Sequence, residues 1–96
     1  MNKDASDVLF QFFAAYFNED WPYDASTPDE IIDRYIPMHP REQRLHLAGL
    51  IEMFIAERDD DSLKRALFEE LACYYVPEAD GQVRSWMEHV ARRLRS

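Results

Sequence analysis

The chain has 96 residues; 47% are hydrophobic, and 19 acidic residues against 11 lysines and arginines give a net charge of −8. This length holds one hydrophobic core and excludes a separate cofactor domain, so we predict a single domain over residues 1–96, and the apolar content excludes wholesale disorder. The negative charge repels phosphates and predicts no direct binding to nucleic acid.

Helical spacing of apolar residues recurs along the chain, while strand-like alternation and hairpin turn pairs are absent. The sequence therefore predicts an all-α fold, a compact domain of about five short helices. The first helix is expected over residues 7–17, with Ser6 as its N-cap. Its inward positions are Leu9, Phe12, Phe13 and Tyr16. Phe10 and Phe17 add a second apolar flank, which predicts a central helix.

The second helix has the clearest start signal in the chain, the sequence TPDE at residues 27–30. Thr27 suits the N-cap, Pro28 suits the first helical position, and Glu30 completes a capping box. We expect Pro37 and Pro40 to end this helix, because proline cannot continue it.

The remaining three helices are expected over residues 41–58, 62–72 and 83–94. Gly49 lies inside the first of these, where glycine costs up to about 1 kcal/mol relative to alanine, and we interpret it as the mark of a close helix crossing. The aspartates at 59–61 break the chain and supply a cap for the next helix. Four arginines against one glutamate in residues 82–96 suit the negative end of the last helix dipole.

Residue patterns for catalysis or metal binding are sparse. Glu42 and His46 stand at i, i+4 in an expected helix and could share a metal, but such a pair is more commonly a surface hydrogen bond. Cys73 lies in the apolar sequence LACYY and is interpreted as a buried thiol. We therefore predict a protein that is not an enzyme, with no catalytic residue, cofactor or metal. A small metal-dependent hydrolase that uses Glu42 and His46 remains an alternative.

The predicted compartment is the cytoplasm. One cysteine cannot form an intrachain disulfide, and its isolation suits a reducing compartment. The first residues, MNKDASDVLFQFF, lack the long apolar core and cleavage site of a secretory signal. No apolar run approaches the ~18 residues that span a bilayer, so we expect no membrane partner.

Two stretches of the sequence resemble a known family. The first is Tyr-Phe-Asn-Glu-Asp-Trp at residues 16–21, between an aromatic helix and a capped acidic helix. The second is ELACYYVPEADG at residues 70–81, followed by a last helix with the sequence RSWMEHVARRL. Their order and spacing, over nearly the whole chain, resemble the small all-helical immunity proteins of contact-dependent growth inhibition (CDI), the CdiI-like family. Pro22 and a slightly short turn after Gly81 depart from the family pattern.

The resemblance implies a cytoplasmic antitoxin that binds and neutralises the C-terminal toxin domain of a CDI effector, often a nuclease, and we expect a 1:1 complex. Because a nuclease is basic where it holds its substrate, the charge of −8 leads us to expect an acidic contact surface. The candidate toxin-binding residues are Asp24, Asp29, Asp33, Asp59, Asp60 and Asp61. Trp21 and Tyr23 are candidate aromatic anchors. The identity of the toxin stays open, as does the alternative of a general helical interaction module or regulator subunit.

A motif shared by proteins that each fit a different toxin is expected to hold the fold rather than to touch the partner. We therefore expect Phe17 and Trp21 to pack inside. Asp20 is expected to accept hydrogen bonds from nearby backbone N–H groups or from the indole. Tyr74 and Tyr75 are likewise expected to pack, with a turn after them.

Overall fold

The computed structural model describes residues 5–77 and 81–96 of the chain. These residues form six α-helices and one 3-10 helix, and none of them lies in a strand. The elements are α1 (Ala5–Tyr16), α2 (Trp21–Asp24), α3 (Pro28–Tyr35), η1 (Ile36–Met38), α4 (Arg41–Ala56), α5 (Asp60–Glu69) and α6 (Gln82–Arg95). The predicted all-α class is confirmed: five of these helices have eight residues or more, and the four-residue α2 is additional.

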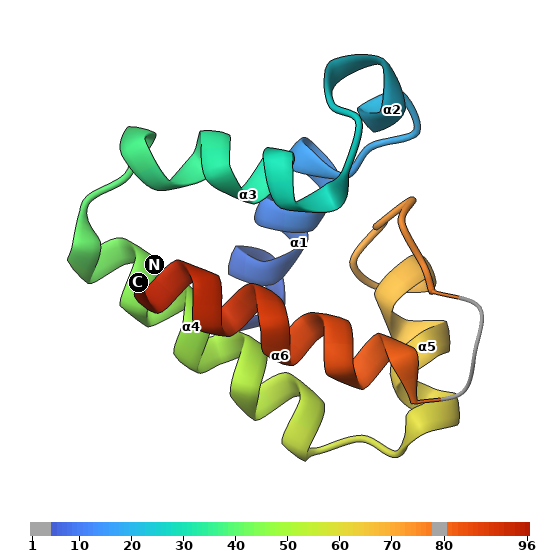
Figure 1. The fold of residues 1–96 in the computed structure, drawn as a ribbon. Helices are drawn as coiled ribbons and strands as arrows, with labels where there is room; N and C mark the ends of the chain where they lie inside the picture. The colour runs from blue at the N-terminus through green and yellow to red at the C-terminus, as the bar shows by residue number, and fades with distance from the viewer. Residues whose placement is uncertain (1–4, 78–80) are drawn as a thin grey trace.

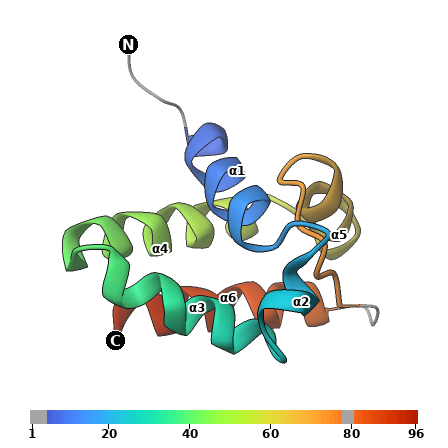
Figure 2. The same ribbon diagram turned by 90° about the horizontal axis from the view of Figure 1, so that it is seen from above.

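The centre of the fold is the pair α4 and α6, which lie side by side in opposite directions (Figure 1). α3 and α5 pack against α6, and α1 packs against α4. α1 crosses α4 and α6 at a steep angle, as Figure 2 shows. The α4–α6 pair is therefore covered by α3 and α5 along α6 and by α1 along α4.

The core is built from the apolar faces of the long helices. Phe13 of α1 and Phe17, directly after α1, are fully buried in this core. So are Ile32 of α3, Ile51 of α4 and Met87 of α6. No polar or charged residue is buried among the residues whose burial the structure describes. Removal of apolar surface from water is therefore what holds the helices together.

Side-chain caps are present at both places where the sequence predicts them. Thr27 Oγ1 accepts a hydrogen bond from the Glu30 N–H at 3.3 Å, and Pro28 is the first residue of α3. The Glu30 carboxylate reaches back to accept the Ser26 N–H at 3.0 Å, one residue earlier than a standard capping box. Asp59 caps α5 by accepting the Ser62 N–H at 2.8 Å.

Some predicted helix boundaries are wrong. α1 begins at Ala5, so Ser6 lies inside the helix and is not its N-cap. α5 begins at Asp60, directly after its cap, and not at residue 62. It ends three residues before the predicted 72, because Ala72 has a left-handed φ of 53° that no helix continues.

The aromatic motif packs largely as predicted. Phe17 is fully buried, and the half-buried Trp21 lies 6.2 Å from it and 5.7 Å from Tyr75, ring centre to ring centre. The expectation for Asp20 is wrong, because its carboxylate makes no capping hydrogen bond. The Asn18 side chain instead accepts the Asp20 N–H at 2.9 Å.

Tyr74 does not pack inside as predicted; its side chain is 48% exposed. Its N–H donates to the Phe17 carbonyl oxygen at 2.8 Å, which fixes the backbone at the end of α1, and its ring lies outside, 5.2 Å from the ring of Phe68. Phe10 of the predicted second flank is also outside, 46% exposed. Of the predicted turn at residues 77–81, residues 78–80 lie outside the described part of the chain.

The prediction of a close helix crossing at Gly49 is wrong. A Cβ atom at this position would meet nothing within 4 Å apart from its chain neighbours and the nearby backbone of α4 itself. Gly81 differs, because its φ of 83° at the start of α6 is one that L-residues rarely adopt.

Replacement of Gly49 by alanine is expected to stabilise the protein by about 0.5–1 kcal/mol, since alanine loses less backbone entropy in a helix and has space here. Urea unfolding measures the change. The matched variant Gly81→Ala is expected to destabilise the protein, because it places a side chain at positive φ. A destabilised Gly49→Ala would mean that the backbone of α4 has a packing partner at this position.

Candidate functional site

The six aspartates predicted to contact a partner lie on three elements. Asp24 ends α2, Asp29 and Asp33 lie on α3, and Asp59, Asp60 and Asp61 form the start of α5. Ion pairs join Asp29, Asp33 and Asp60 to arginines of α6. Within the part of the chain that the structure describes, the carboxylates of these three aspartates therefore already have an intramolecular ion-pair partner, which distinguishes them from the others in the predicted set.

On α3, both aspartates pair with α6. His89 Nε2 donates to Asp29 Oδ1 at 2.9 Å. Arg93 Nη1 lies 3.9 Å from the other oxygen of Asp29, and Arg93 Nη2 donates to Asp33. Asp29 and Asp33 are four residues apart on α3, and so are His89 and Arg93 on α6. The two acidic groups therefore lie on one face of α3, opposite the two basic groups on one face of α6. These half-exposed pairs add little stability, but they leave less negative charge for a partner.

At the start of α5, Arg84 joins three helices. Its Nε donates to Asp60 at 2.8 Å, and its Nη1 donates to the Ile55 carbonyl oxygen of α4 at 2.6 Å. Its Nη2 donates to the Arg58 carbonyl oxygen that follows α4. Arg84 therefore satisfies carbonyl groups at the C-terminal end of α4, which have no partner within that helix.

The other two aspartates at this end differ from Asp60. Asp59 is occupied as the cap of α5, and the hydrogen bonds from Ser62 hold the pKa of its carboxyl below the usual value of 3.8. Asp61 is exposed and makes no ion pair with another described residue.

The carboxylates at α2 are also available. Glu19, Asp20 and Asp24 are exposed and form no ion pair within the described part of the chain. Tyr23 lies among them and is 89% exposed, whereas Trp21 of the same helix packs against the core. We call Glu19, Asp20, Tyr23 and Asp24 the α2 acidic surface. Of the two candidate aromatic anchors, only Tyr23 faces solvent with its whole ring.

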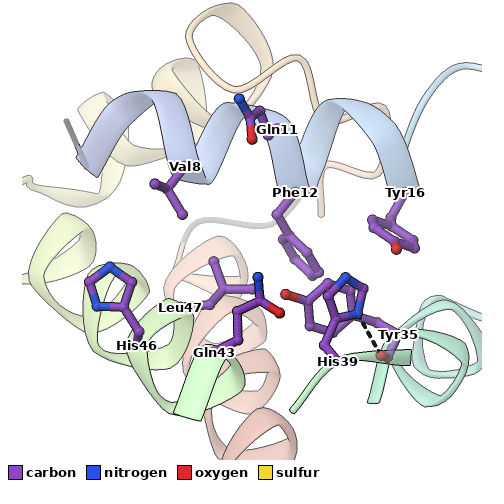
Figure 3. Close-up of a pocket in the computed structure, with 9 residues that line it drawn as sticks. All are labelled: Val8, Gln11, Phe12, Tyr16, Tyr35, His39, Gln43, His46 and Leu47. Atoms are coloured by element: carbon purple, nitrogen blue, oxygen red, sulfur yellow. Dashed lines mark hydrogen bonds between the residues drawn. The ribbon is translucent and has the colours of Figure 1, made fainter. Parts of the chain in front are cut away.

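A pocket of about 400 Å³ opens between α1, the end of α3 and α4 (Figure 3). Its lining side chains are Val8, Gln11, Phe12, Tyr16, Tyr35, His39, Gln43, His46 and Leu47. We call it the α1–α4 pocket. The pocket cannot be recognised in the sequence, because its lining comes from three separate segments and its tyrosines fit the pattern of a helix core.

The wall of the α1–α4 pocket formed by Tyr35 is fixed on several sides. The His39 ring stacks on the Tyr35 ring with 3.8 Å between centres, and His39 Nδ1 donates to the Tyr35 carbonyl oxygen at 3.0 Å. Burial raises the pKa of the Tyr35 hydroxyl, the neighbouring Tyr16 adds to the rise, and the Arg44 guanidinium opposes it. The hydroxyl of Tyr35 is therefore neutral at physiological pH.

Groups considered for catalysis or metal binding are scattered. Glu42 and His46 are both exposed on α4, and no three described histidine, cysteine, aspartate or glutamate residues are close enough to hold a metal ion. Cys73 is fully buried and donates to the Tyr75 carbonyl oxygen at 3.2 Å. Burial raises the pKa of the Cys73 thiol to about 12, which keeps it protonated and unreactive.

In the part of the chain that the structure describes, no helix combines the length and the apolar character needed to cross a membrane.

Comparison with known proteins adds two findings. The family described as CdiI immunity protein matches residues 6–94. A chain of the crystal structure of a CdiA-CT/CdiI complex from Y. kristensenii 33638 has a similar fold, with a TM-score of 0.80 and 23% sequence identity over 95% of this chain and 99% of that chain. At this identity the structural likeness establishes the fold alone. No curated protein matches the chain.

The pKa of Asp59 predicts a pH-dependent cap. Since the carboxyl has a lower pKa in the folded protein, its ionised form stabilises the fold above its unfolded pKa, and this stabilisation is lost as the pH falls through the folded pKa. Asp59→Ala is therefore expected to lower the free energy of unfolding more at about pH 7 than at about pH 3. Urea unfolding at both pH values measures the difference. Asp59→Asn, which keeps a capping oxygen without a charge, is the control; a pH-independent effect of Asp59→Ala would contradict the role of the charge.

Proposed function

Because the chain belongs to the CdiI immunity protein family, we propose that it binds and neutralises the C-terminal toxin domain of a contact-dependent growth inhibition effector. The observation that carries the proposal is the family match over residues 6–94. The fold shared with a chain of a CdiA-CT/CdiI complex supports it. The protein acts in the cytoplasm as a 1:1 inhibitor and not as an enzyme: it occupies a surface of the toxin.

The contact surface is acidic and faces a basic toxin domain, such as a nuclease that holds a phosphate backbone. The net charge of −8 supports this, since it speeds encounter with a basic partner. The α2 acidic surface is its centre, because its carboxylates surround an exposed tyrosine and form no ion pair with any residue that the structure describes. Exposed tyrosines of this kind supply large contact area when a partner covers them.

The predicted aspartates contribute unequally to this surface. Asp24 and Asp61 are available to toxin cations. Asp29, Asp33 and Asp60 already face arginines of α6, so a toxin lysine or arginine would have to share them.

Co-expression with the toxin domain encoded beside this chain tests the function. The expected result is restored growth and co-purification of the two proteins in equal amounts, because an inhibitor that works by occupancy must stay bound. A toxin domain from an unrelated effector serves as the control and is expected to remain toxic. Unrelieved toxicity of the neighbouring toxin in the presence of folded protein would contradict the proposed function.

Charge reversal tests the contact surface separately. Asp20→Lys with Asp24→Lys is expected to slow association with the toxin about tenfold or more at low salt, because it removes attraction at the point of contact. The difference should shrink as salt screens the charges. Stopped-flow association rates measure it.

The matched control for this reversal is Glu69→Lys with Glu88→Lys, which makes the same change in net charge at exposed carboxylates on α5 and α6. It is expected to slow association less. Equal slowing by both variants would show that net charge alone matters, and no slowing by either would refute an acidic contact surface.

A further inference from the structure

We propose that the α1–α4 pocket receives one aromatic side chain of the toxin, a tyrosine or a tryptophan. The proposal rests on the proposed function, because the guest belongs to the toxin domain. Its evidence is separate, namely the shape and chemistry of the pocket.

The pocket has aromatic walls suited to another ring. Phe12 and Tyr16 both stand edge-on to Tyr35, with ring centres 5.0 Å and 5.2 Å apart and planes at 83° and 84°. Aromatic rings prefer such perpendicular contacts. Phe12 and Tyr35 are themselves nearly buried, so an entering ring would pack mainly against the partly exposed rings of Tyr16 and His39. Figure 3 shows these rings beside the opening between α1 and α4.

The charge and the size of the pocket narrow the choice of guest. Among the described residues that line it, none is aspartate, glutamate, lysine or arginine. A guanidinium, ammonium or carboxylate guest would therefore lose its hydration without gaining an ionic partner. The volume of about 400 Å³ lies in the range of ordinary ligand pockets and exceeds what a small aliphatic side chain needs.

Polar groups in the lining suit the polar end of a tyrosine or tryptophan. Since His39 Nδ1 donates to a carbonyl oxygen, Nε2 of the neutral ring is left as an acceptor. The Gln43 amide and the His46 ring also line the pocket. Buried hydroxyl and indole N–H groups need such a partner, which phenylalanine does not.

The first experiment uses the free protein and small probes. Titration with p-cresol and with indole, followed by NMR, is expected to shift signals of the Gln43 amide and the His39 and His46 rings. Methylguanidinium and acetate serve as charged probes and are expected to leave these signals unchanged. Absence of shifts with both aromatic probes, or equal shifts with the charged ones, would overturn the proposal.

The second experiment fills the pocket and measures affinity for the neighbouring toxin domain by calorimetry. Gln43→Trp is expected to weaken binding about 30-fold or more, the size of effect seen at binding hot spots. Gln82→Trp makes the same replacement at an exposed position outside the pocket and is expected to bind as wild type does. Thermal unfolding of both variants verifies that they fold.

The outcomes separate the two proposals. If wild-type protein neutralises the toxin and Gln43→Trp binds equally well, the pocket proposal falls and the proposed function stands, even where indole binds. If wild-type protein does not bind the toxin, the proposed function falls, and the pocket proposal falls with it because the guest is a toxin residue.

Discussion

The structure depends on α6, which is apolar on one face and basic on another. Val90 and Leu94 bury its apolar face against the core, mostly over α4. Its arginines reach the neighbouring helices: Arg84 to the junction of α4 and α5, and Arg93 to α3. The apolar contacts supply most of the free energy, because half-exposed ion pairs are each worth about 0–1 kcal/mol. The ion pairs determine which carboxylates remain for other molecules.

Local signals in the sequence identified the elements of the fold. The cap at Thr27 and a cap among the aspartates at 59–61 were predicted because a cap depends on residues within one turn; the structure has both, the second at Asp59. The short helix α2 was not predicted, since four residues carry no helical period. The interpretation of Gly49 failed because helical position alone does not reveal what faces it.

The candidate site was less predictable, for a physical reason. Asp29 and Asp33 were chosen for their charge, but their partners His89 and Arg93 lie 60 residues away in the sequence. Nothing in the pattern of either segment shows that the two helices meet at this register. The α1–α4 pocket depends on the packing of three segments in the same way.

The attachment of α2 has a consequence for how such a protein can diversify. Its inward side depends on Trp21, which packs beside Phe17 and Tyr75, while its outward residues touch little of the remaining molecule. Substitutions at Glu19, Tyr23 or Asp24 can therefore accumulate without loss of the scaffold. Such a protein could therefore adapt to a changing partner by substitutions at these few positions, while Trp21 keeps α2 attached to the core.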